Sequence, residues 1–125
     1  MRVPLALSAV VELGAGLGML LLPSPLAVIL LGSSLDTAVS VTVARVAGLA
    51  LIALGISCWF VRYDGKGRAA RGVLGAMVLY NIGACALLVF VGAGLQLTGI
   101  GWWPAVLVHG ALGVWCVASL IREKP

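Results

Sequence analysis

Residues 39–61 read VSVTVARVAGLALIALGISCWFV, an apolar run in which Arg45 is the only charged residue. A helix that crosses the bilayer needs about 20 mainly apolar residues, because the hydrocarbon core is roughly 30 Å thick. Three further stretches, residues 3–22, 72–94 and 102–121, have a similar length and character. The sequence therefore predicts four membrane-spanning helices.

The composition agrees with a lipid environment. Hydrophobic residues make up 62% of the chain and charged residues 10%, and the mean hydropathy is +1.19. A water-soluble domain of this size cannot hide so much apolar surface. Four spans with short connections use residues 1–125, so we expect one all-α domain, an antiparallel bundle of four transmembrane helices. This leaves no room for a separate soluble catalytic domain.

The connection after the first span has a distinct pattern. Pro23-Ser24-Pro25 ends that span, because proline removes backbone donors and cannot continue a helix. Residues 26–31 are apolar but too short to cross the membrane. We expect a short segment that lies at the membrane interface.

The basic residues predict the orientation. Seven of the eight Lys and Arg residues lie at the N-terminus, in the loop 62–71 or at the C-terminus, and the first and third connections have none. The positive-inside rule then places both termini in the cytoplasm. Topology and attraction to anionic lipid head groups account for the net charge of +4, so we expect no nucleic-acid partner.

Each span carries one strongly polar side chain: Glu12, Arg45, Asn81 and His109. Such groups are rare in hydrocarbon because they are expensive there. At a helical rise of about 1.5 Å per residue, the four fall within roughly 6 Å of one another in depth. We predict a shared polar layer with a Glu12–Arg45 ion pair, in which Asn81 and Tyr80 satisfy the remaining donors and acceptors.

Three interpretations of this layer remain open. It can fix the packing of a unique bundle, as buried polar groups sometimes do. It can bind a small amphiphile such as a quinone or a lipid. It can also form part of a proton or ion path, although the spans contain no further acidic relay residues.

Other kinds of site have little support. Cys58, Cys85 and Cys116 lack metal-binding spacing, so no metal site is expected and buried apolar roles are favoured. His109 is the only histidine, and no second axial ligand for haem is evident. The pattern indicates no catalytic residue and no particular cofactor.

Several motifs resemble the DoxX-like group of small bacterial four-helix membrane proteins. They are residues 8–14 (SAVVELG), the break at residues 23–25 (PSP) and residues 44–48 (ARVAG). The resemblance implies the same fold in a bacterial cytoplasmic (inner) membrane, with both termini inside. The group has mixed functions, including association with oxidoreductase complexes, so the resemblance transfers no catalytic residue.

The leading hypothesis is a non-enzymatic membrane protein whose polar layer binds a small amphiphile or supports a larger membrane complex or homo-oligomer. A close alternative is a structural accessory subunit of a redox or photosynthetic complex. An intramembrane isomerase with Glu12 and His109 as acid and base is third, and a proton-coupled transporter is fourth.

Overall fold

The chain forms five α-helices in the computed structural model, which describes residues 1–65 and 67–122. Four of them are long and apolar enough to cross a membrane, so the predicted all-helical fold is confirmed. In chain order the helices are α1 (Arg2–Leu21), α2 (Pro23–Leu31), α3 (Ala38–Val61), α4 (Arg68–Leu95) and α5 (Trp102–Arg122).

The boundaries follow the prediction closely except at the start of α4. This helix begins at Arg68, four residues before the predicted start at Gly72. Hydropathy marks the residue at which the apolar part of the helix begins. The helix itself begins one turn earlier, in the basic stretch that starts at Arg68. At about 1.5 Å per residue, the 28 residues of α4 span roughly 42 Å, which exceeds the bilayer core by about two turns.

The short segment after the first span is the nine-residue helix α2. Pro23 occupies its first position, where the missing backbone donor has no cost. Gly32 then ends the helix in the left-handed region, with φ 72°. The Pro-Ser-Pro break therefore redirects the chain into a new helix instead of a loop.

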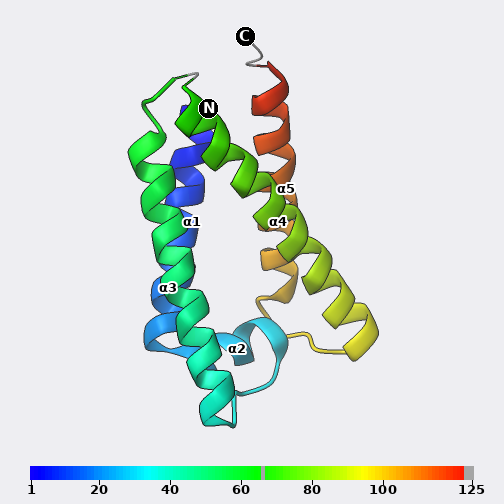
Figure 1. The fold of residues 1–125 in the computed structure, drawn as a ribbon. Helices are drawn as coiled ribbons and strands as arrows, with labels where there is room; N and C mark the ends of the chain where they lie inside the picture. The colour runs from blue at the N-terminus through cyan, green and yellow to red at the C-terminus, as the bar shows by residue number, and fades with distance from the viewer. Residues whose placement is uncertain (66, 123–125) are drawn as a thin grey trace.

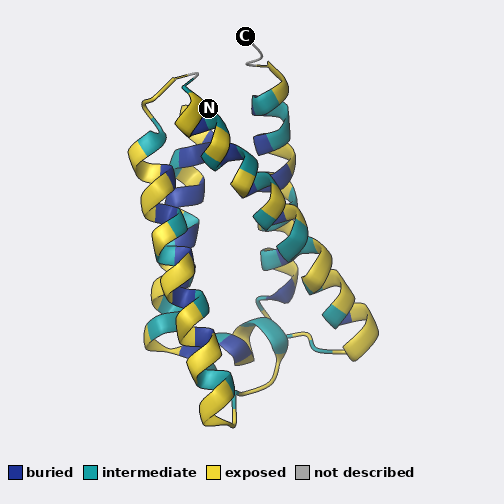
Figure 2. Ribbon diagram, viewed as in Figure 1, coloured by how far each residue is buried: buried dark blue, intermediate teal, exposed yellow. Residues whose placement is uncertain are grey.

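The four long helices associate as two pairs. Figure 1 shows α1 packed along α3 and α4 packed along α5, and these two contacts are far more extensive than any others. The pairs meet near the end that carries both termini and diverge toward α2 (Figure 1). Buried positions face the interior of this arrangement, whereas most of the outward surface is exposed apolar side chain (Figure 2).

Glycines bring α1 and α3 into backbone contact. A Cβ atom at Gly48 would lie 2.7 Å from the Gly16 carbonyl oxygen, and a Cβ atom at Gly16 would lie 2.7 Å from the Gly48 oxygen. Lipid supplies no hydrophobic driving force between helices, so close packing of this kind is what holds them together. The contact also fixes the rotation of α3 about its own axis.

Backbone hydrogen bonds join the two pairs at the α2 end. The Gly99 amide donates to the Leu30 carbonyl oxygen over 3.1 Å, and the Gly101 amide donates to the Ile29 oxygen over 2.8 Å. A Cβ atom at Gly99 would lie 2.2 Å from the Ile29 oxygen, so only glycine fits there. The connection that precedes α5 is thus held against α2.

Aromatic and basic side chains join α1 and α3 at the opposite end. Arg2 donates to the Tyr63 hydroxyl over 3.0 Å, and the Arg62 guanidinium lies over the rings of Trp59 and Tyr63. Arg62 and then Arg2 lower the pKa of the exposed Tyr63 hydroxyl, because both cations favour the phenolate. The cluster has the composition of a membrane-interface anchor.

Candidate functional site

The buried core lies where the two helix pairs meet and receives side chains from all four long helices. Its apolar part consists of Leu5, Ala9, Cys58, Ala70, Leu74, Met77 and Cys116. Three polar side chains, Ser8, Glu12 and Asn81, are fully buried beside it. The core is therefore partly polar at a depth where no water is available to satisfy hydrogen bonds.

Glu12 is the most unusual member of this core. Both carboxylate oxygens are buried, and no described residue forms a hydrogen bond with either. The Tyr80 hydroxyl is near enough to interact with the carboxylate, although the two do not reach hydrogen-bonding geometry. An unsatisfied buried polar group costs about 1–3 kcal/mol, and more when it is charged. Glu12 thus has hydrogen-bonding capacity that the described residues do not use.

Asn81 and His109 join α4 to α5. The Asn81 side-chain Nδ2 donates to the Met77 carbonyl oxygen over 2.9 Å, and its Oδ1 lies 2.9 Å from His109 Nδ1. Because an amide oxygen only accepts, His109 Nδ1 carries the proton and donates. In a neutral ring, Nε2 is then left with a lone pair.

Tyr80 lies next to both of these groups. Its ring meets the His109 ring edge-on, with centroids 5.5 Å apart and an interplanar angle of 80°. Its hydroxyl faces the Glu12 carboxylate. Of the five residues that the sequence singled out, the structure therefore brings Glu12, Tyr80, Asn81 and His109 together.

Arg45 is the exception, and the predicted ion pair with Glu12 is wrong. Arg45 is exposed on the outer face of α3, and within residues 1–65 and 67–122 it makes no ion pair. The stripe of α3 that faces the interior includes Ala44, Gly48 and Gly55. One residue further along a helix points about 100° away, so Arg45 turns to the lipid side. Counting residues gives the depth of Arg45 in the membrane but not its direction around the helix axis.

The polar layer also includes three small side chains, Ser8, Cys58 and Cys116, all fully buried. The Ser8 hydroxyl has no hydrogen-bond partner among the described residues and faces the Cys116 thiol, while the Cys58 thiol lies near the Glu12 carboxylate. All three cysteines are free, as expected for small apolar residues. The i, i+4 spacing of Ser8 and Glu12 was the signal for Ser8, whereas only the fold could place the thiols. Among the described residues, no three metal-ligating side chains come together.

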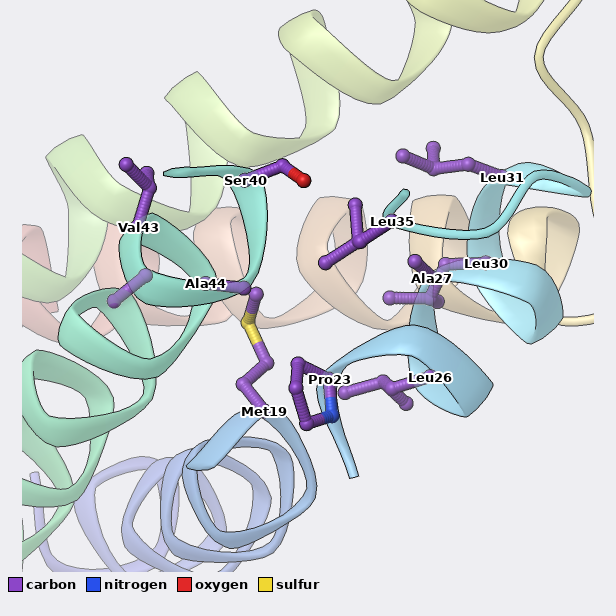
Figure 3. Close-up of a pocket in the computed structure, with 11 residues that line it drawn as sticks. Met19, Pro23, Leu26, Ala27, Leu30, Leu31, Leu35, Ser40, Val43 and Ala44 are labelled. Carbon is purple, nitrogen blue, oxygen red and sulfur yellow. The ribbon is translucent and has the colours of Figure 1, made fainter. Parts of the chain in front are cut away.

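An apolar pocket of about 410 Å³ lies toward the α2 end (Figure 3). The end of α1, one side of α2, Leu35 and the start of α3 form its walls, and Ser40 is the polar residue among the described residues that line it. The lining includes Met19, Pro23, Ala27, Leu30, Ala44 and Ala47. The sequence gave no sign of this pocket, because each of these residues is ordinary in a membrane protein.

The pocket and the polar layer lie along the same face of α1. Met19 follows Glu12 by seven residues, which is two helical turns or about 10 Å along the axis. Ala44 and Ala47 line the pocket from α3, and Ala44 belongs to the interior stripe of that helix. None of Glu12, Tyr80 and His109 lines the pocket, and the Gly16–Gly48 contact lies between the pocket and Glu12 along α1.

Comparison with known families, with curated proteins and with solved structures finds no match for this chain. The resemblance to the DoxX-like group stays a prediction that rests on its short motifs. Any functional assignment must therefore come from the chemistry of the site itself.

Proposed function

We propose that this chain is a small integral membrane protein that binds a small amphiphile, a quinone or a lipid, with the polar head of the ligand against Glu12, Tyr80 and His109. The observation that carries the proposal is the Glu12 carboxyl group, which is fully buried and receives no hydrogen bond from residues 1–65 or 67–122. A group of this kind is costly in the empty protein. Its cost is offset when a ligand supplies the missing hydrogen bond.

The chemistry of the layer favours a ligand that donates hydrogen bonds. The Glu12 oxygens accept, and so does Nε2 of a neutral His109 whose Nδ1 proton is directed at Asn81. The edge-on pair of Tyr80 and His109 offers aromatic surface to a flat ring. A quinol, with two hydroxyl groups on a ring, matches these features better than the oxidised quinone.

The apolar pocket supplies a place for the tail of such a ligand. Its volume of about 410 Å³ is within the usual range for small-molecule sites. Each methylene group that moves from water into an apolar site contributes about 0.8 kcal/mol, although the gain is smaller for a ligand that is already in lipid. The pocket therefore serves mainly to position the tail and so to select among lipid-soluble ligands.

The proposal includes location and orientation. The basic residues favour a bacterial cytoplasmic membrane with both termini inside, and the resemblance to the DoxX-like group supports the same arrangement. Under this orientation the pocket lies in the outer leaflet.

Direct titration tests the head-group contact. The purified protein in lipid nanodiscs is titrated with a benzoquinol that carries a ten-carbon tail, kept reduced, and tryptophan fluorescence reports binding. We expect saturable binding that weakens about tenfold or more in Glu12→Gln, because the carboxyl group that accepts the hydrogen bond of the ligand is lost. Thr42→Val, a change of the exposed surface, is the control and should leave the affinity unchanged.

Equal affinity in wild type and Glu12→Gln would overturn the assigned head-group site. Absence of saturable binding, together with stoichiometric co-purification of a larger membrane protein in mild detergent, would favour the accessory-subunit alternative.

A second pair of variants tests the tail. Ala47→Phe fills the pocket, whereas Ala50→Phe adds the same group to the exposed face of the same helix. We expect Ala47→Phe to remove the preference for the tailed quinol over a tail-less one and to leave binding of the tail-less compound unchanged. If Ala50→Phe has the same effect, or Ala47→Phe has none, the pocket does not hold the tail.

A further inference from the structure

Arg45 has an arrangement that the proposed ligand site does not explain. It is exposed on α3 inside a membrane span, and no hydrogen bond or ion pair to it is formed by residues 1–65 or 67–122. Its neighbours along the same face include Thr42 and Leu49, both exposed. A cation that faces hydrocarbon is expensive unless a group outside the chain satisfies it.

The position of Arg45 along α3 places its guanidinium near one membrane surface. Arg45 is seven residues from Ala38, where α3 begins, and therefore about 10 Å along the axis. The 24 residues of α3 span about 36 Å, which is enough to cross the roughly 30 Å core with Ala38 at or beyond its edge. Helical side chains tilt toward the N-terminus of their helix, which for α3 is the end next to α2. A long arginine side chain can therefore extend to the head-group layer of that leaflet.

We propose that Arg45 binds the phosphate of an anionic phospholipid in the leaflet next to α2. A guanidinium presents a planar set of donors that matches two phosphate oxygens at once. Val46 and Leu49 lie on the membrane-centre side of Arg45 and are 61% and 55% exposed, so they can contact the acyl chains of the same lipid. This site is separate from the quinol site and does not depend on it.

The surrounding charges favour an anion from the membrane. Between residues 22 and 61, and again between residues 95 and 103, the only formal charges are Arg45 and Asp36. Asp36 accepts a hydrogen bond from Ser34 in the loop that precedes α3. Thr42, the polar neighbour of Arg45, donates its hydroxyl to the Ala38 carbonyl oxygen over 2.7 Å. Arg45 is thus the cation of this end. The Thr42 hydroxyl beside it is used within α3, and Val46 and Leu49 offer exposed apolar surface to a lipid.

Lipid retention measured by native mass spectrometry tests this site. The full chain is released from nanodiscs that contain equal amounts of phosphatidylglycerol and phosphatidylcholine. We expect the wild-type protein to retain one phosphatidylglycerol preferentially. Retention of this lipid should fall about tenfold in Arg45→Leu. It should be intermediate in Arg45→Lys, because lysine keeps the charge but loses the planar donors. Arg68→Leu changes the net charge equally at the opposite end of the bundle and should retain the wild-type preference.

Four outcomes would overturn the proposal. A wild-type protein without a preference between the two lipids would remove the site. Equal loss in Arg45→Leu and Arg68→Leu would indicate a general charge effect. Displacement of the lipid by millimolar inorganic phosphate would indicate a site for free anions. A dimer or a second protein that is lost only in Arg45→Leu would indicate a carboxylate partner. Circular dichroism checks that each variant is folded.

Discussion

Glu12 on α1 and Arg45 on α3 are the two full charges inside the spans, and the structure gives them opposite surroundings. Glu12 is fully buried where four helices meet and has no hydrogen-bond partner in the part of the chain that the structure describes, whereas Arg45 is exposed on the lipid side of its helix. A short carboxylate cannot reach a membrane surface from the interior, but a long arginine can. The difference shows that a charge in a span can mark an interior site or a contact with head groups.

The largest expected effect comes from changing the Gly16–Gly48 contact, which sets the rotation of α3 and so turns Arg45 away from Glu12. Gly48→Leu places a side chain where even a Cβ atom would lie 2.7 Å from the Gly16 oxygen, so α3 must separate from α1 or rotate. We expect a loss of about 3 kcal/mol in the free energy of unfolding, at the upper end for overpacked cores. Unfolding in mixed micelles, followed by circular dichroism, measures it.

Gly14→Leu is the matched control, because a Cβ atom there has no neighbour within 4 Å. Its effect should stay within about 0.5 kcal/mol, as for other surface substitutions. Similar losses in both variants would show that the Gly16–Gly48 contact does not determine the rotation of α3.

Replacing Glu12 should have a smaller effect on the free energy of unfolding, and it should increase this free energy. Replacing an unsatisfied buried carboxylate with an apolar side chain of similar size removes a desolvation penalty, so Glu12→Met should stabilise the ligand-free protein by about 1–3 kcal/mol. Arg45→Met should change stability by less than Glu12→Met, because Arg45 is exposed. The same unfolding assay measures both. Destabilisation by Glu12→Met would mean that the carboxylate holds the bundle together.

The smallest expected effect is the loss of the hydrogen bond between Asn81 and His109 in the polar layer. A double-mutant cycle with Asn81→Leu and His109→Leu should give a coupling energy of about 1 kcal/mol, the usual net value for one hydrogen bond. The cycle of Asn81→Leu with Arg45→Leu should give a coupling near zero, because the two residues do not interact. Equal coupling in both cycles would place Arg45 in the same network as Asn81.

The spans and the short helix α2 were predictable because they depend on local features, namely hydropathy, length and the Pro-Ser-Pro break. The start of α4 was placed four residues late because Arg68 and Arg71 favour a helix but not hydrocarbon. In both cases the physical cause lies within the segment itself.

The polar layer was harder to predict because it depends on how the helices rotate against one another. Depth follows from counting residues, and it pointed to Glu12, Asn81 and His109, which do lie in the interior. Direction around a helix follows from packing, which for α3 is set by a glycine contact with α1. That is why Arg45 was assigned to the layer. The apolar pocket depends on three elements at once and has no local signature.

Infrared difference spectroscopy at Glu12 tests the central claim most directly. Glu12 is the only carboxylic side chain inside the spans, and Asp36 and Asp64 are exposed. When the tailed benzoquinol is added, the account predicts a shift of a carboxyl band, because the ligand donates a hydrogen bond to Glu12, and it predicts that Glu12→Gln lacks this shift. An unchanged carboxyl band on saturation, or the same shift in Glu12→Gln, would contradict it.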